Sequence, residues 1–514
     1  VDSRARLWLG SEEDPAFGDL TSAVAAEVRA AFEHNNPEWR KRKRMGFPVG
    51  GEQRIDCTWR NEQDADGRWW LSVPRGGLRR ATAILRVHGH ALEFDDRSTL
   101  GDPFLAGQIP AHRLELFGYQ LEAVDALVAG QNCLLRSSTA SGKTSVGFAL
   151  AARLNLPTLV IVYTGNLFEQ WGERAGSELG LAPADVGKVR GRAGLGSVRP
   201  FTVAMQQTVA AHPEWIALHA KTFGLVIADE VQVTPAASAT AAIDGWWSRY
   251  RIGISNDETR PDGREYVTYD LFGRIACDVP RERVEREGHV MPVEVRVVPT
   301  AFRADWYVRS RGNRRPTDLK RLVDEMVTNE ARNEQIAVLA LEESGRGESV
   351  LVLTHRRGHA HSLDSLLARR GVLTGLLVGG AEYEKRFRET RDGLRSGKLR
   401  AGVGTVQAVG MATDIPTLSR GIVVTPLASS RQPFDQARGR LARVRRDGGE
   451  KSLPILYYLL DELVVGLKPL RNLSRWYGDR VTVLDSGAWV PAREYLRRAS
   501  KRRMVSRSFD PEVG

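Results

Sequence analysis

The stretch that most constrains the fold is a serine- and glycine-rich turn, SSTASGKT, at residues 137–144. The apolar residues Cys133 to Leu135 predict the end of a buried strand before it, and residues 144–154 have the spacing of a helix. This order matches the phosphate-binding pattern G-x-x-x-x-G-K-[ST], with Ser137 at the position of the first glycine. The pattern predicts a parallel α/β domain with a nucleotide site, and a plain turn before a helix is the alternative.

The residue types of this turn suit phosphate binding. Gly142 lets backbone N–H groups close around the phosphates, and Lys143 places a positive charge beside the β and γ oxygens. The hydroxyl of Thr144 lies at the positive end of the helix and can bind Mg²⁺. We therefore expect ATP and Mg²⁺ as ligands, with Ser141, Gly142, Lys143 and Thr144 around the nucleotide and Thr144 also on the metal.

Two adjacent carboxylates end a later apolar strand. Residues 223–228 are mostly apolar, and Asp229 and Glu230 follow directly. We expect Asp229 to hold Mg²⁺ through its water shell and Glu230 to orient and deprotonate the attacking water. An acidic pair that caps a helix is the alternative. Upstream, the amide of Gln120 could donate to and accept from the N6 and N7 edge of adenine, so we also expect Gln120 in the nucleotide site.

Polar side chains follow two other expected strands. Thr164 and Thr208 come soon after the apolar runs 158–162 and 201–204. Parallel sheets bind ligands at the carboxyl ends of their strands, and hydroxyl groups commonly contact nucleic-acid backbones. We expect both threonines to contact nucleic acid.

Residues 302–316, FRADWYVRSRGNRRP, combine aromatic side chains with arginines. We expect Trp306 to stack on a base and Arg314 to bind a phosphate, as in segments that hold or separate strands. A flexible basic linker is the alternative.

The charge of the chain indicates a polyanionic partner. The 514 residues carry a formal net charge of +11, and basic runs occur at residues 40–44 and 497–503. Each run by itself could be ordinary solvated surface.

Composition disfavours several other classes of protein. No stretch approaches roughly 18 uninterrupted apolar residues and no signal-peptide pattern opens the chain, so we expect a cytoplasmic, nucleoid-associated protein without membrane contact. Cys57, Cys133 and Cys277 lie far apart, which disfavours zinc modules and disulfide frameworks. His88 and His90 precede three acidic residues, but no second ligand cluster accompanies them, so we expect no metal there.

The order of the motifs resembles one family. Gln120, SSTASGKT, LVIVYTGNLFEQW (159–171), FTVAMQQT (201–208), DEVQ (229–232) and RIGISNDETRPDG (251–263) resemble the first RecA-like half of a superfamily 2 helicase. The group most similar contains XPB, UvsW and related phage and bacterial DNA helicases. SVLVLT (349–354), GVGTVQAVGMATDIP (402–416) and QARGRLAR (436–443) resemble motifs IV, V and VI of the second half.

The resemblance implies roles for residues of the second half. Thr354 and Thr405 would contact nucleic acid. Gln436, Arg440 and Arg443 would act on the γ-phosphate held by the first half, with the two arginines as arginine fingers.

The expected fold is α/β, with two tandem RecA-like parallel-sheet domains and an N-terminal α+β accessory domain. We expect, in chain order, an accessory domain for DNA or a partner at residues 1–110, the first RecA-like domain at 111–298, a linker or insertion at 299–325, the second RecA-like domain at 326–465 and a basic extension at 466–514.

The resemblance implies an ATP-dependent DNA helicase or translocase that moves 3′ to 5′. We expect DNA as a single strand, fork or duplex to be the partner of a monomer, and a protein partner of the accessory domain is left open. Asn256 and Asp257 replace the Ala-Thr pair that usually follows Ser255, and Gln232 stands where His or Asp is usual. These departures keep open a nucleotide-switched DNA remodeller or scaffold with weak or no unwinding, and an RNA helicase is a third reading.

Overall fold

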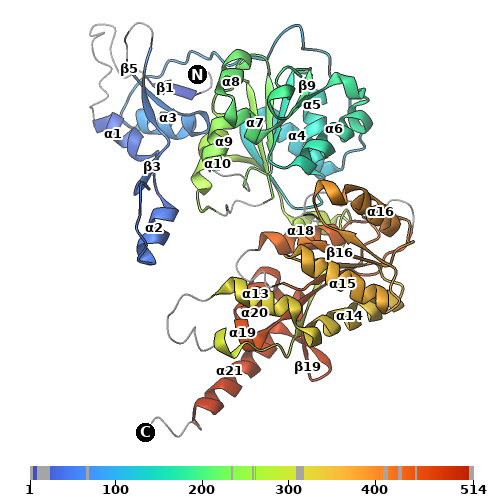
Figure 1. Cartoon of the computed structure of the whole chain (residues 1–514). Coiled ribbons are helices and arrows are strands. Elements are labelled where there is room, and N and C mark those ends of the chain that lie inside the picture. Colours follow the sequence, from blue (N-terminus) through green and yellow to red (C-terminus); the bar gives the residue numbers. More distant parts are fainter. Residues whose placement is uncertain are drawn as a thin grey trace. The chain divides into compact units, whose positions relative to one another are not determined.

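A computed structural model describes residues 4–7, 23–64, 67, 69–232, 236–256, 260, 262–307, 318–406, 408, 415–425, 431–445 and 449–508. The chain divides into two compact units, one extending to Arg283 and the other beginning at Val284. Each unit is built on a sheet of parallel strands flanked by helices (Figure 1). The expected α/β fold with two RecA-like domains is therefore confirmed.

The sheet of the first unit has seven described strands, all parallel. Their spatial order is β12 (Ile275–Val279), β6 (Asn132–Ser137), β11 (Tyr250–Ser255), β10 (Leu225–Asp229), β7 (Thr158–Val162), β9 (Phe201–Met205) and β8 (Val186–Val189). The central strands β7 and β10 are buried along their whole length, as expected for parallel strands with helices on both faces.

Helices cover both faces of this sheet. Figure 1 shows α4, α5 and α6 gathered on one side and α8, α9 and α10 on the other. The helices of this domain are α4 (Gly118–Gly130), α5 (Lys143–Leu154), α6 (Gly165–Leu179), α7 (Gln206–Ala211), α8 (Pro213–His219), α9 (Ala236–Ile243), α10 (Glu265–Phe272) and α11 (Arg281–Arg286).

The N-terminal residues form the expected small α+β domain. Its antiparallel sheet has the order β1 (Arg4–Leu7), β5 (Trp69–Pro74), β4 (Arg60–Gln63), and a separate ribbon pairs β2 (Glu33–Asn35) with β3 (Ile55–Cys57). The helices are α1 (Ala23–Ala30), α2 (Pro37–Arg44) and α3 (Leu78–Val87). Val28 of α1, Leu71 of β5 and Leu85 of α3 share one buried core.

The accessory domain packs tightly on α10 of the first RecA-like domain. The side chain of Asp270 in α10 is 2% exposed, and it accepts a hydrogen bond of 2.6 Å from Thr58 and contacts His34 at 3.2 Å. Burial raises the pKa of Asp270, but its hydrogen bonds and the Arg80 guanidinium outweigh this and hold the pKa below its usual value. A Cβ atom at Gly76 would lie 2.4 Å from the backbone of Gly273, so only glycine allows this approach.

The sheet of the second unit has eight described strands, parallel except for the last pair. Their order is β15 (Thr374–Leu377), β16 (Ala401–Thr405), β14 (Val350–Thr354), β17 (Arg420–Val423), β18 (Ile455–Leu460), β13 (Glu294–Pro299), β19 (Val481–Asp485) and β20 (Ala488–Pro491). The helices include α13 (Leu319–Thr328), α14 (Glu330–Gly345), α15 (Arg357–Arg369), α16 (Glu384–Arg395), α18 (Gln432–Leu441), α19 (Glu462–Val465), α20 (Lys468–Tyr477) and α21 (Ala492–Ser508).

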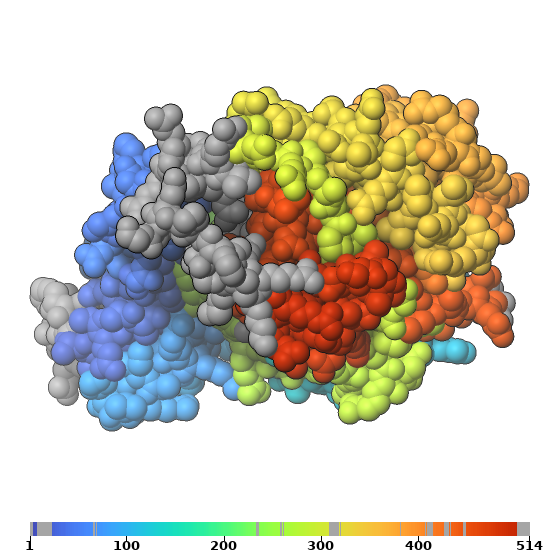
Figure 2. All heavy atoms as spheres, turned by 90° about the horizontal axis from the view of Figure 1, so that it is seen from below, coloured from blue at the N-terminus to red at the C-terminus, as the bar shows by residue number. Residues whose placement is uncertain are grey.

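Two segments lie outside the domains in which we expected them. We expected the first RecA-like domain to extend to residue 298, but β13 pairs with β18 and β19 in the second sheet. We expected residues 466–514 to be an extension, but β19 and β20 continue that sheet. Figure 2 shows the red C-terminal residues side by side with yellow-green residues that precede α13.

A buried ion pair lies at the carboxyl end of β18. Arg332 of α14 donates hydrogen bonds of 2.8 and 3.1 Å to the two carboxylate oxygens of Asp461. The two side chains are 1% and 0% exposed. Thr300 also donates to Asp461 at 2.6 Å, so the buried carboxylate accepts hydrogen bonds from two side chains.

Candidate active site

The predicted phosphate-binding turn connects β6 to α5. Gly142 has φ 82° and ψ 32°, a left-handed conformation that glycine adopts without strain. A Cβ atom there would lie 2.3 Å from the amide nitrogen of Gln120. The hydroxyl groups of Ser137 and Ser141 lie 2.5 Å apart, and Ser141 also donates to the carbonyl of Ser138 at 2.7 Å. Ser137, which replaces the first glycine of the pattern, therefore ties the two ends of the turn together.

Gln120 supports the turn in this structure. Its amide nitrogen donates to the carbonyl of Ser141 at 3.0 Å, and its amide oxygen accepts from the backbone N–H of Phe117 at 2.9 Å. The neighbouring Tyr119 hydroxyl donates to the same Ser141 carbonyl at 2.8 Å. Gln120 is buried, with both ends of the amide engaged, so adenine recognition by this residue would require those bonds to exchange. Tyr119 was not predicted, although it precedes Gln120 directly.

Asp229 is the last residue of β10 and is buried at 4% exposure. Its Oδ2 accepts a 2.9 Å hydrogen bond from the indole of Trp171 in α6, whereas among the described residues Oδ1 has no hydrogen-bond partner. Burial and the Glu230 carboxylate raise the pKa of Asp229 to about 6. A buried carboxylate oxygen without a donor is suited to a metal-bound water, so the residues fit the predicted Mg²⁺.

Lys143 and Glu230 form an ion pair across the turn. The Lys143 ammonium donates to Oε1 of Glu230 at 3.0 Å, and the side chains are 11% and 23% exposed. Glu230 has φ 55°, which is uncommon for a residue other than glycine and is frequent at functional sites. The structure therefore brings together the predicted lysine, aspartate and glutamate at the carboxyl edge of the first sheet.

Gln232 connects Glu230 to the end of β11. Its amide nitrogen donates to Oε2 of Glu230 and, at 2.8 Å, to Oδ1 of Asn256. Its amide oxygen accepts from the hydroxyl of Ser255 at 2.7 Å. Gln232 is 1% exposed, so a fully buried amide replaces the His or Asp expected from the family. Asp257 lies outside the described residues.

The structure gives Arg260 and Asp262 internal partners. Arg260 is 3% exposed and donates to the carbonyl of Val231 at 2.7 Å. It also bonds both carboxylate oxygens of Asp262 at 3.0 Å. Arg260 therefore fixes the backbone next to Glu230.

The two threonines predicted as nucleic-acid contacts in the first sheet differ in their surroundings. Thr164 caps α6 and accepts a weak 3.4 Å hydrogen bond from Leu167. Thr208 is 9% exposed and accepts from the backbone N–H of Gly191 at 2.9 Å. Thr208 therefore holds the turn after β8, and its role in nucleic-acid binding stays a prediction.

In the second unit, Thr354 and Thr405 are buried. Thr354 is 0% exposed, with its hydroxyl 2.9 Å from Nδ1 of His359 and 3.2 Å from the hydroxyl of Thr425. Thr405 is 8% exposed and accepts from the backbone N–H of Ala408 at 3.3 Å. Strand-end packing encloses the Thr354 hydroxyl, and its contact with nucleic acid stays a prediction.

Trp306 is part of a small hydrophobic cluster with Tyr307 and Met326. Its indole donates to Glu325 at 2.8 Å, and the Arg321 guanidinium lies 4.3 Å from the ring centroid. In this arrangement Arg321 covers a ring face that we predicted would stack on a base. Arg314 lies outside the described residues.

The motif VI residues lie on or beside α18. Gln436 and Arg440 are half-buried on the helix, and Arg443 follows its end. Arg438 is 3% exposed and lies 4.1 Å from the ring centroid of Tyr477 in α20, which explains how α18 is fixed. The approach of Arg440 and Arg443 to a γ-phosphate on the first unit stays a prediction.

Among the helices of the described residues, none combines the length and the apolar composition that a bilayer crossing would require.

Comparisons with known proteins agree with this site. The sequence profile described as the res subunit of type III restriction enzymes matches residues 113–255. The chain is 28% identical over 345 residues to the DNA 3′-5′ helicase XPB of Kineococcus radiotolerans, covering 64% of this chain and 58% of that protein. It is 25% identical over 359 residues to the probable helicase D10 of Escherichia phage T5, covering 70% of this chain and 72% of that protein.

Among solved structures, S. cerevisiae Dbp5 bound to RNA and ADP BeF3 is similar at 13% identity and a TM-score of 0.52, covering 76% of this chain and 93% of that one. This likeness shows the fold alone. The chain spans less than two thirds of the XPB relatives it matches, 58% and 59% of their lengths. The profile, the relatives and the predicted motifs agree, and together they support a similarity to the XPB-like helicases of superfamily 2.

Proposed function

We propose that the chain is an ATP-driven motor on DNA, a helicase or translocase of superfamily 2. One observation carries the proposal: the Lys143–Glu230 pair lies at the carboxyl edge of one parallel sheet, together with Oδ1 of Asp229, which has no hydrogen-bond partner in the described part of the chain. Ligands bind at this edge in α/β sheets. The names of the XPB relatives, DNA 3′-5′ helicases, support DNA as the substrate and 3′ to 5′ as the direction.

The residues of the first unit have separate tasks in ATP hydrolysis. Gly142 and Ser141 shape the backbone turn around the phosphates, and Lys143 exchanges its bond to Glu230 for one to a phosphate oxygen. Glu230, freed from that ion pair, positions the attacking water and accepts its proton. Thr144 and Asp229 would hold Mg²⁺, which when bound neutralises charge on the β- and γ-phosphates.

The second unit supplies positive charge to the same reaction. Arg440 and Arg443 approach the γ-phosphate when the two RecA-like domains close, and Gln436 assists from the same helix. Release of the γ-phosphate removes the group that joins the domains, so they reopen. Repetition of this cycle on a strand produces stepping.

Gln232 provides a connection between hydrolysis and movement. It bonds Glu230 on one side and Ser255 and Asn256 on the other, so a shift of Glu230 must alter the hydrogen bonds at the end of β11. This network favours coupling over a motor that only hydrolyses ATP. The alternative, a nucleotide-switched DNA remodeller with weak unwinding, keeps the same hydrolytic site.

DNA-stimulated ATP hydrolysis, measured beside unwinding of a labelled fork, tests the proposal. We expect hydrolysis that rises with DNA and requires Mg²⁺, together with strand separation. Hydrolysis with no unwinding would support the remodeller, and stimulation by RNA over DNA would support an RNA helicase.

The variant Lys143→Ala tests whether ATP hydrolysis and DNA binding depend on different residues. We expect hydrolysis to become undetectable while DNA affinity changes less than about twofold, because the lysine supplies the charge at the phosphates. The matched control is Lys385→Ala, since Lys385 is 90% exposed on α16 in the second unit. Full turnover by Lys143→Ala would refute the assignment.

A further inference from the structure

The end of α18, the helix with the motif VI residues, contacts a half-buried lysine. The Lys451 ammonium donates to the backbone carbonyl of Leu441 at 2.6 Å and to that of Arg443 at 2.8 Å. Leu441 is the last residue of α18, and Arg443 lies two residues beyond it. The last carbonyls of a helix have no partner within the helix, and a positive charge is favourable at that end. Capping of α18 is therefore the simplest role for Lys451.

The surroundings of Lys451 are unfavourable for a positive charge. Burial lowers the pKa of Lys451 to about 7, and the nearby Arg443 and Arg445 guanidinium groups act in the same direction. A neutral donor could cap the carbonyls without this electrostatic cost. A charge held against such a cost is typical of functional sites.

The backbone at Arg443 is also fixed from a second side. Arg443 pairs with Val290 in an isolated antiparallel bridge, and the N–H of Met291 donates to the carbonyl of Ala442 at 2.7 Å. Val290 is 3% exposed and belongs to the segment between α11 and β13. Because Arg443 lies beyond the helix, these bonds and those of Lys451 set the direction in which its side chain leaves the backbone.

Lys451 itself is attached to the core of the second unit. The hydroxyl of Ser452 donates to Glu348 at 2.6 Å, and Arg420 of β17 donates to the carbonyl of Leu453 at 3.0 Å. Arg420 is 7% exposed and also bonds Glu348 at 2.8 Å. The lysine therefore extends from an anchored backbone and can hold the end of α18 in one place.

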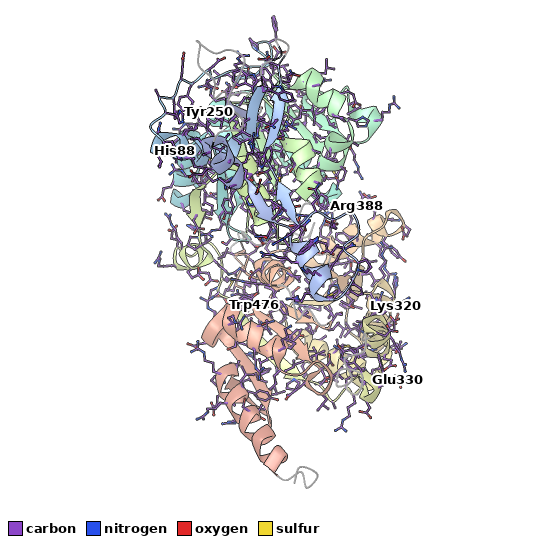
Figure 3. All side chains as sticks on the ribbon, turned by 90° about the vertical axis from the view of Figure 1, so that its left-hand side faces the viewer. His88, Tyr250, Lys320, Glu330, Arg388 and Trp476 are labelled. Carbon is purple, nitrogen blue, oxygen red and sulfur yellow. The ribbon has the colours of Figure 1, made fainter. Side chains whose placement is uncertain are left out.

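The beginning of α18 is held separately, by α20. The rings of Phe434 and Trp476 have centroids 6.2 Å apart, and the hydroxyl of Tyr477 donates to Asp435 at 3.0 Å. Trp476 is labelled in Figure 3. Both contacts are made by the first turn of α18, so loss of Lys451 should leave the helix in place and alter only its end.

We propose that Lys451 is a positioning residue for Arg443, which holds the turn after α18 so that the Arg443 guanidinium meets the γ-phosphate in the correct orientation. The proposal rests on the proposed function, in which Arg443 acts on that phosphate. A misplacement of about 1 Å at a reacting group can lower a rate about a hundredfold. Lys451 should therefore affect the rate of hydrolysis and not the affinity for nucleotide.

The test measures single-turnover hydrolysis of Mg²⁺-ATP by the full chain with saturating single-stranded DNA. Lys451→Met keeps the length of the side chain and removes its donors. The rate should fall roughly ten- to a hundredfold, while the affinity for Mg²⁺-ATP stays within about threefold. The matched control is Lys385→Met, at a residue that is 90% exposed on α16, and its rate should stay within about twofold of the unaltered chain.

A second measurement combines Lys451→Met with Arg443→Ala. If Lys451 acts through Arg443, its loss has no further effect once the guanidinium is absent. The double variant should then hydrolyse ATP within about twofold of the rate of Arg443→Ala. If Lys451 only supports folding, Lys451→Met should lower the rate by the same factor in both backgrounds, because the folded fraction is reduced in each.

Two results would overturn the proposal: a rate in Lys451→Met equal to that of the Lys385→Met control, or an equal loss in the two backgrounds. Either result, together with slow hydrolysis by Arg443→Ala alone, leaves the proposed function intact. An unchanged rate in Arg443→Ala, or no hydrolysis by the unaltered chain, would instead contradict the proposed function, and the role of Lys451 with it.

Discussion

The two RecA-like sheets end in polar residues of different character. At the carboxyl edge of the first sheet, Asp229 has a buried oxygen for which the described residues provide no hydrogen-bond partner, and Glu230 has a strained backbone. At the same edge of the second sheet, Thr354 and Asp461 are fully buried and hydrogen-bonded to their neighbours. The same fold thus has two kinds of polar strand end. Those of the first sheet have atoms available to bind a ligand, and those of the second sheet stabilise the domain itself.

Under the proposed function, this difference would place nucleotide binding at the edge of the first sheet and not at the edge of the second. In the described residues, β14 of the second sheet is not followed by a phosphate-binding turn. The hydroxyl of Thr354 at the end of β14 is enclosed by His359 and Thr425. Under the proposed function, the second unit would contribute to hydrolysis through α18, whose Gln436 and Arg440 are half-buried. Variants at each edge should therefore affect different properties, stability in the second unit and ligand binding in the first.

The largest effect on stability is expected from the ion pair of the second unit. Asp461→Ala leaves the buried Arg332 guanidinium without its carboxylate and should lower the free energy of unfolding of that unit by about 3–5 kcal/mol. Chemical denaturation monitored by circular dichroism measures the change. Asp324→Ala, which removes a 54% exposed partner of Arg356, is the control and should cost less than about 1 kcal/mol. Equal effects of the two variants would show that the Arg332–Asp461 pair is not structural.

Acid should also destabilise the second unit. Nε2 of His359 lies 2.9 Å from Oδ1 of Asn333, an acceptor, so Nδ1 accepts from Thr354 and the ring is neutral. Burial lowers the pKa of His359 to about 4, whereas the unfolded chain has the usual value of 6.5. The unfolded state therefore binds more protons between these values, and stability falls by up to about 3 kcal/mol as pH decreases from 6.5 to 4.

Thermal unfolding at a series of pH values measures this dependence. His359→Asn removes the titrating group and should flatten the curve between pH 6.5 and 4, even if it lowers stability at neutral pH. An unchanged acid dependence in the variant would assign the effect to another group.

The smallest effect is expected at the first sheet from Trp171→Phe. Loss of the indole donor removes the hydrogen bond to Oδ2 of Asp229 and should weaken Mg²⁺-dependent hydrolysis about tenfold. Raising the Mg²⁺ concentration should restore the rate in part. Trp70→Phe removes a similar indole bond of 2.9 Å, to Asp64 in the accessory domain, and should leave hydrolysis unchanged. A defect that Mg²⁺ does not relieve would indicate damage to packing and not to the metal site.

Much of the fold and the nucleotide site could be predicted from the sequence, because each depends on local patterns. Apolar runs followed by polar residues located β6 and β10, and the Gly-Lys-Thr triplet located the turn between β6 and α5. Long-range pairing could not be predicted in this way. β13 reads as a strand from its own residues, but its membership of the second sheet depends on β18 and β19, far along the chain.

The burial of side chains at strand ends also could not be predicted from the sequence. Thr164 and Thr354 both follow apolar runs, yet Thr164 caps a helix and Thr354 is enclosed by side chains from α15 and the loop after β17. No local pattern in the sequence predicts the hydrogen bond between Trp171 and Asp229, because the two residues lie 58 positions apart. The roles of such residues follow only from the packed structure.

Hydrolysis by Arg440→Ala in single-turnover conditions tests most directly whether the first unit binds nucleotide and the second completes the reaction. The account predicts that Mg²⁺-ATP binds with an affinity within about threefold of the unaltered chain while the rate of hydrolysis falls about 10³-fold or more. Arg388→Ala, an exposed residue of α16, is the control and should match the unaltered chain. A hydrolysis rate in Arg440→Ala equal to that of the control would contradict the account.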